Sequence, residues 1–130
     1  MLKGSCHCQK VQWQFDEIPE STTACNCTVC RRYGVLWAYD YDGEKIHVSG
    51  PTQIYVRGDS IEFHFCPACG CVAYWRSQKL DDAGRRLIAV NLRLTEEPEH
   101  IAHLPIDHFD GLDSYQRLPR DGRCVADHWF

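Results

Sequence analysis

Eight of the nine cysteines in this chain lie in three short groups, and any fold must satisfy their thiols. The groups are Cys6-His7-Cys8, Cys25-Asn26-Cys27-Thr28-Val29-Cys30 and Cys66-Pro67-Ala68-Cys69-Gly70-Cys71. An odd number of cysteines in CxC and CxxC spacings favours metal thiolates over disulfides. The stretch from Met1 to Cys6 also lacks the apolar segment of a signal peptide, so we expect a cytoplasmic protein whose thiols bind metal.

The composition is that of an ordinary globular domain. Apolar residues make up 44% and charged residues 25% of the 130 residues, which suffices for one domain over 1–130 with a buried core. The net charge is -4 and the basic residues are scattered, so nucleic acid is not an expected partner. No apolar run approaches the roughly 20 residues of a membrane span, so no membrane association is expected either.

Short alternating segments between turn residues predict an all-β fold. Val11, Trp13 and Phe15 would share one face of a strand. The dipeptide Asp42-Gly43 favours a hairpin that joins strands at 35–41 and 44–49. Further extended segments are expected at 22–24, 52–57, 60–65, 72–76 and 87–92, with one helical turn at 30–34 and a loop-rich tail after residue 95.

The first and third cysteine groups predict a closed zinc site. Residues two apart in a strand point the same way, so Cys6 and Cys8 would present both sulfurs to one metal. Cys66 and Cys69 form a knuckle in which Gly70 permits the tight turn. Four thiolates leave no open position on a tetrahedral zinc, which is typical of a structural site.

The central group has the makings of an open site. Cys25, Cys27 and Cys30 can converge on one cation from a single segment, and three protein ligands leave the fourth position that a catalytic zinc needs. Two alternatives stay open on spacing alone. Cys71 could complete a closed four-thiolate site with this triplet, or Cys66, Cys69 and Cys71 could form a three-thiol cluster themselves.

Other candidate residues have weaker sequence support. Asn26 is a poor zinc ligand, His7 is expected to point away from the Cys6 and Cys8 face, and Cys124 is expected to be a small buried residue. Surface positions are the default for the tail histidines, although one of them could serve as an acid or base: His100, His103 and His108. Arg31 and Arg32 follow the triplet directly and could bind a substrate carboxylate.

The three cysteine groups, in order and with their neighbouring residues, closely resemble the glutathione-dependent formaldehyde-activating enzyme family, which also contains centromere protein V. The matching segments are Gly4-Ser5-Cys6-His7-Cys8, Cys25-Asn26-Cys27-Thr28-Val29-Cys30-Arg31, Phe65-Cys66-Pro67-Ala68-Cys69-Gly70 and Pro98-Glu99-His100-Ile101. The resemblance implies a zinc-binding β-tent of small twisted antiparallel sheets. It also implies two zinc ions per chain: a structural one on Cys6, Cys8, Cys66 and Cys69, and a catalytic one on Cys25, Cys27 and Cys30.

The activity that the resemblance implies is carbon–sulfur lyase chemistry, in which glutathione or another small thiol adds reversibly to formaldehyde or another small aldehyde. S-hydroxymethylglutathione is such an adduct. This sequence departs from the family pattern at Asn26, where many relatives have histidine, at Cys71, where a small hydroxyl residue is common, and at Asp107-His108. The alternative hypothesis is a non-catalytic zinc module of the same fold that acts as a binding or chaperone domain.

Overall fold

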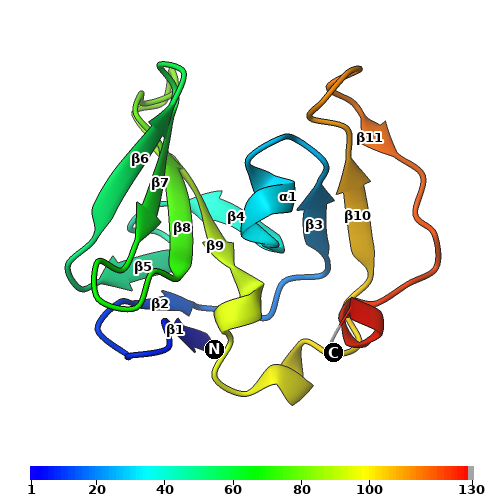
Figure 1. The fold of residues 1–130 in the computed structure, drawn as a ribbon, viewed down its shortest axis with the longest axis horizontal. Helices are drawn as coiled ribbons and strands as arrows, with labels where there is room; N and C mark the ends of the chain where they lie inside the picture. Colours follow the sequence, from blue (N-terminus) through cyan, green and yellow to red (C-terminus); the bar gives the residue numbers. More distant parts are fainter. Residues whose placement is uncertain (129–130) are drawn as a thin grey trace.

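A computed structural model describes residues 1–128, and they form two β-sheets with little helix (Figure 1). The smaller sheet is antiparallel, in the order β1 (Leu2–Ser5), β2 (Gln12–Phe15) and β5 (Ile46–Ser49). The larger sheet has eight strands, in the order β11 (Arg117–Leu118), β10 (Ile106–Phe109), β3 (Thr22–Cys25), β4 (Trp37–Tyr41), β9 (Leu87–Asn91), β8 (Val72–Ser77), β7 (Ile61–Phe65) and β6 (Gln53–Arg57). The predicted all-β class is therefore confirmed.

The helical segments are short. A single α-helical turn, α1 (Cys30–Tyr33), ends at Gly34 in the left-handed conformation, as the sequence predicts. Three 3₁₀ turns complete the described chain: η1 (Leu92–Leu94), η2 (Pro98–His100) and η3 (Val125–His128). Within residues 1–128, no helix has the length and apolar character needed to cross a membrane.

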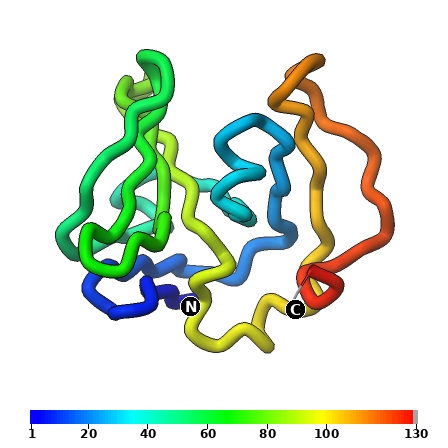
Figure 2. Tube along the Cα trace, viewed as in Figure 1, coloured from blue at the N-terminus to red at the C-terminus, as the bar shows by residue number. Residues whose placement is uncertain are grey.

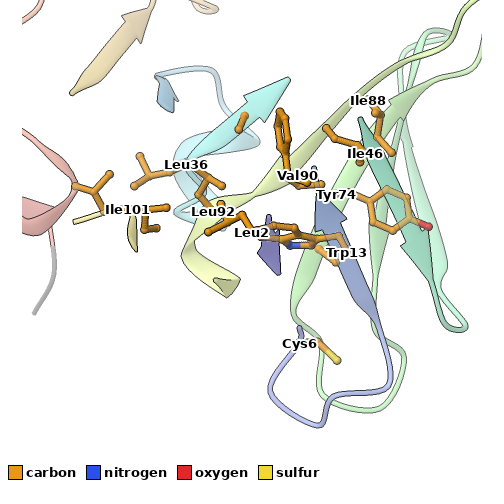
Figure 3. Close-up of a cluster of buried hydrophobic side chains, with 14 of the residues drawn as sticks. Leu2, Cys6, Trp13, Leu36, Ile46, Tyr74, Ile88, Val90, Leu92 and Ile101 are labelled. Carbon is orange, nitrogen blue, oxygen red and sulfur yellow. The ribbon is translucent and has the colours of Figure 1, made fainter. Parts of the chain in front are cut away.

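The main core lies between the small sheet and the middle of the large one (Figure 3). The predicted face of Val11, Trp13 and Phe15 is buried, and these side chains pack with Ile46 and Val90. Burial of a side chain of this size stabilises a fold by roughly 1.5–3 kcal/mol, so this cluster fixes the N-terminal strands against the large sheet. Cys6 lies at the rim of the same cluster, which places the first thiol group next to the core.

The predicted hairpin at Asp42-Gly43 is wrong. Gly43 does turn the chain with a positive φ of 78°, but β4 pairs with β3 and β9, whereas β5 pairs with β2 in the other sheet. The turn therefore carries the chain from one sheet to the other. Local turn chemistry cannot distinguish these outcomes, because the partner of each strand is chosen by its buried side chains.

One pairing departs from the expected antiparallel sheets, and it comes from the tail. β10 runs parallel to β3, with Phe109 opposite Cys25 and His108 opposite Ala24. The tail after residue 95 thus contributes two strands, β10 and β11, to the large sheet in addition to loops and 3₁₀ turns. As a result, the end of β10 lies beside Cys25, the first thiol of the triplet.

The two ends of the large sheet rise on either side of α1 and β3 (Figures 1 and 2). The β6–β7 hairpin forms one wall, and the segment that joins β10 to β11 forms the other. A second buried cluster lies at the base between them and includes Cys27, Cys30, Trp37, Phe63 and Trp75. The central thiols therefore pack against buried aromatic side chains.

Candidate functional site

The structure brings together the sulfurs of Cys6, Cys8, Cys66 and Cys69, all within 4.8 Å of one another. The Sγ atoms of Cys6 and Cys8 are 3.6 Å apart, and those of Cys8 and Cys66 are 3.5 Å apart. Four sulfurs bound at about 2.3 Å to one tetrahedral zinc would be separated by roughly 3.8 Å. These residues consequently fit a zinc ion with small adjustments.

Two turns create this convergence. The Gln9 N–H donates to the Cys6 carbonyl at 2.9 Å, and the Gly70 N–H donates to the Cys66 carbonyl at 2.8 Å. Gln9 and Gly70 both have positive φ, at 68° and 82°. The expectation that Cys6 to Cys8 lies in a strand is wrong, because β1 ends at Ser5 and a turn aims both sulfurs.

Backbone N–H groups favour thiolates at this four-cysteine group. The N–H groups of Cys71 and Cys8 lower the pKa of the Cys69 thiol to about 5. The Val11 N–H donates to the Cys6 Sγ at 3.3 Å. Donors aimed at sulfur stabilise the charged form that binds metal.

The second group consists of Cys25, Cys27 and Cys30, whose sulfurs also lie within 4.8 Å of one another. Cys25 ends β3, Cys27 lies in the following bend, and Cys30 begins α1. The Cys27 N–H points to the Cys25 Sγ at 3.5 Å, and the Cys30 N–H points to the Cys27 Sγ at 3.3 Å. The predicted convergence from one continuous segment is thus present.

Hydrogen bonds favour the thiolate form of one member of the triplet. A hydrogen bond from the Cys30 thiol, assisted by the Cys27 N–H, lowers the pKa of Cys25 to about 5. The same hydrogen bond, together with burial, raises the pKa of Cys30. The indole N–H of Trp37 donates to the Cys30 Sγ at 3.4 Å. Two backbone N–H groups and one indole N–H therefore donate to the sulfurs of the triplet. Three thiolate ligands suit a cation of soft or borderline-soft character such as zinc.

A pocket with a volume of about 220 Å³ opens onto the triplet. Its walls are mainly aromatic. They come from the middle and both ends of the large sheet and from the loop before β11: Trp37, Tyr39, Phe63, Trp75, Phe109 and Tyr115. The remaining residues besides the thiols are Arg57, Ile61 and Gly111. An apolar pocket with a few polar groups converging on a reactive centre is the usual form of a small-molecule site.

Gly111 closes one side of the triplet from the tail. A Cβ atom at this position would lie 2.6 Å from the Cys25 Sγ and 3.0 Å from the Cys27 Cβ. Its backbone N–H also hydrogen-bonds Cys25 and helps to lower the pKa of that thiol. Only glycine permits this approach, so the tail loop forms part of the thiol environment.

Asp110 holds that loop in place. Its carboxylate accepts hydrogen bonds from the backbone N–H groups of Leu112, Asp113 and Ser114, from the Ser114 hydroxyl and from the Asn26 side-chain amide. These donors lower the pKa of Asp110. Asn26 is therefore a tether between the triplet and the loop, with a distance of 3.1 Å between its Nδ2 and the Asp110 Oδ1.

Both alternative groupings that involve Cys71 are contradicted. Its sulfur belongs to neither thiol group, and its carbonyl accepts the Cys66 N–H at 3.0 Å, beside the four-cysteine group. Burial raises the pKa of the Cys71 thiol. Cys71 therefore does not close the triplet, and the pairing of Cys66 and Cys69 with Cys6 and Cys8 replaces the three-thiol alternative.

The other predicted candidates lie away from the pocket. Arg31 and Arg32 are exposed on α1, and Arg32 donates to the Thr28 carbonyl. His100 lies 3.6 Å from Glu97, and His108 lies 3.4 Å from Asp121, while His103 is exposed. His7 is exposed outside the thiol group, and Cys124 is partly buried and caps a turn with Asp127 rather than being fully buried.

Apart from the thiols, the residues that line the pocket carry no signal of this role in the sequence. Arg57 ends an edge strand, and Tyr115 lies in the tail loop with a φ of 55°, a left-handed conformation that is uncommon for a bulky residue. Such a conformation costs on the order of 1–3 kcal/mol and occurs most often at functional sites. Segment 35–41 contains three aromatic residues, Trp37, Tyr39 and Tyr41, but the sequence does not show which of them face the pocket.

Comparisons with known proteins identify the family to which this chain belongs. The family model described as "Glutathione-dependent formaldehyde-activating enzyme" matches residues 1–105, a range that includes every thiol of both groups. A Halomonas elongata protein named "Putative glutathione-dependent formaldehyde-activating enzyme" is 27% identical over 143 residues, which cover 97% of this chain and 87% of that protein. A crystal structure of a Rhodobacter sphaeroides protein has the same fold, with a TM-score of 0.61 at 23% identity over 80% of this chain and 98% of that one. With the family model matching most of its length, the chain belongs to the glutathione-dependent formaldehyde-activating enzyme family.

Proposed function

We propose that the protein is a zinc-dependent carbon–sulfur lyase that forms or cleaves the adduct of a small thiol, such as glutathione, with an aldehyde. The observation that carries this proposal is the three-thiol group at the floor of a pocket. Within residues 1–128, no fourth cysteine, histidine or carboxylate joins Cys25, Cys27 and Cys30. A three-ligand metal site that faces a pocket is typical of catalytic rather than structural zinc.

The reaction would join the thiol sulfur to the carbonyl carbon. The sulfur–carbon bond forms as the carbonyl π bond breaks, and the proton of the thiol ends on the oxygen, which gives a hydroxymethyl thioether from formaldehyde. The reverse direction regenerates thiol and aldehyde. Both directions conserve all atoms and require no oxidant or reductant.

Zinc bound by the triplet would supply a position for a thiolate or a carbonyl oxygen and would lower the energy of developing negative charge there. The residues of the chain would do the rest. Backbone N–H groups and the Trp37 indole hold the three sulfurs, while the aromatic walls give the reactants an apolar surface beside them. Binding both reactants side by side would add the benefit of proximity.

Tyr39 brings a phenol hydroxyl to the pocket. Burial raises the pKa of its phenol, so the hydroxyl stays protonated throughout the physiological range and can donate a hydrogen bond. It lines the pocket together with the thiols. We assign Tyr39 as a hydrogen-bond donor to the adduct oxygen.

The four-cysteine group would hold a structural zinc. It ties the turn after β1 to the turn after β7, which are distant in sequence, and its closed ligand set leaves no position for substrate. A reduced, thiol-rich compartment suits both groups, so we place the protein in the cytoplasm.

Metal content and activity of the wild type and of Cys27→Ser test this proposal. We expect two zinc ions per chain in the wild type and one in the variant, with loss of thiol–aldehyde adduct turnover but a retained fold. Cys124→Ser is the control, because Cys124 lies outside both groups. A stoichiometry of one in both proteins would exclude the second site, and two zinc ions with no adduct turnover for any thiol would favour a non-catalytic zinc module.

A further inference from the structure

Arg57 gives the pocket a charge that the thiol site itself does not need. It is the only cationic side chain among the described residues that line the pocket, and no acidic side chain lines it with Arg57. Arg57 is half-buried at the end of β6, opposite Ile61 of β7. Its guanidinium therefore offers five N–H donors to a pocket in which no carboxylate pairs with it.

Arg57 differs from the arginines of this chain that are ion-paired. Arg76, Arg85 and Arg120 each pair with a carboxylate, at distances of 3.2, 2.8 and 2.7 Å. Within residues 1–128, the Arg57 side chain makes no ion pair or hydrogen bond, while its backbone pairs with Ile61 of β7. An arginine that is held at an aromatic pocket and left unpaired is well suited to a planar anion, because its fork matches a carboxylate in two parallel hydrogen bonds.

We infer that Arg57 binds a carboxylate of the substrate and thereby selects thiols that carry one. The inference rests on the proposed function and names its substrate class. The sulfur would lie at the triplet and the carboxylate at the opposite wall, on the β6–β7 hairpin. The pocket volume of about 220 Å³ is smaller than the usual 300–1,000 Å³ of sites for larger ligands, so the reacting end and this carboxylate fill it.

Two isosteric thiols test the inference directly: 3-mercaptopropionate and its neutral analogue 3-mercaptopropionamide. Calorimetric titration of the zinc-loaded full chain measures both affinities. In their ratio, the contribution of the thiol group and the carbon chain largely cancels, and the effect of the carboxylate remains. We expect the wild type to bind the carboxylate at least tenfold more tightly, since a hydrogen-bonded charge contributes about 1.5–3 kcal/mol. Arg57→Gln should reduce the ratio to near one, and Arg57→Lys should give an intermediate ratio.

Arg31→Gln is the matched control, because it removes the same charge from an exposed residue of α1 outside the pocket. It should keep the wild-type ratio and the wild-type zinc content. Equal affinities in the wild type, or a preference that survives in Arg57→Gln, would overturn the role of Arg57 while leaving the thiol site intact. If zinc-loaded wild type bound neither thiol, the proposed function would fail, and this inference would fail with it.

Discussion

Replacing Gly111 by Ala places a methyl group against the triplet. The new Cβ would lie 2.6 Å from the Cys25 Sγ, whereas ordinary contacts begin at about 3.5 Å, so the sulfur or the loop must move by roughly 1 Å. Metal–ligand distances vary by only about 0.2 Å. We expect the triplet to bind zinc roughly 10- to 100-fold more weakly, the effect typical of a disturbed ligand environment, and the free energy of unfolding to fall by about 1–3 kcal/mol.

Zinc retained after a graded challenge with a chelator measures this effect. Gly111→Ala should lose one zinc at a chelator concentration at which the wild type keeps two. Gly84→Ala is the control: its φ is +78°, so alanine is strained there too, but no atom lies within 4 Å of the added Cβ and no thiol is disturbed. If Gly111→Ala retained both ions with wild-type resistance, the loop would not constrain the triplet and the reasoning would be refuted.

Three further predictions concern the surroundings of the thiols. Trp37→Phe removes the N–H that donates to the Cys30 Sγ, and we expect several-fold weaker zinc binding at the triplet by chelator competition, since such a bond contributes about 1 kcal/mol; an unchanged affinity would contradict this. Cys71→Ser should keep both zinc ions by elemental analysis, whereas a fall to one would show that this thiol is a ligand. The pKa of Asp110 lies below its ordinary 3.8 because Ser114 and Asn26 hydrogen-bond the carboxylate, so its stabilisation of the loop is complete above that value and is lost as the pH falls towards the folded-state pKa. Amide-exchange protection at Ser114 should therefore fall with acidification in the wild type and be low and independent of pH in Asp110→Asn.

Local signals in the sequence were sufficient for much of the fold. The extended segment expected at 60–65 is present as β7, whose Phe63 belongs to the second buried cluster, and the helical turn expected at 30–34 begins at Cys30 and ends at Gly34. These features depend on neighbouring residues and on the two-residue period of a strand. The turn at Gly43 was also visible, but the sheet that receives the next strand depends on contacts distant in sequence.

The candidate site divides in the same way. The spacing of Cys25, Cys27 and Cys30 predicted their convergence, because all three lie within one turn of chain. The sequence did not predict that Arg57 and Gly111 line the pocket. Their positions depend on the strand order of the large sheet, which local periodicity does not determine. The parallel pairing of β10 with β3 brings the tail to the triplet. Parallel strands are not joined by a tight turn, so no local turn residues predict this pairing.

The central claim is that the triplet holds a metal with an open position for a thiol. Cobalt(II) substituted for zinc tests it most directly, because thiolate-to-metal charge transfer gives an absorption band whose intensity increases with the number of bound thiolates. Addition of glutathione should strengthen this band in the wild type and leave it unchanged in Cys27→Ser, where only the closed four-cysteine site remains. If the wild type bound two cobalt ions and its absorption band did not change with glutathione, the triplet metal would have no open position for a thiol.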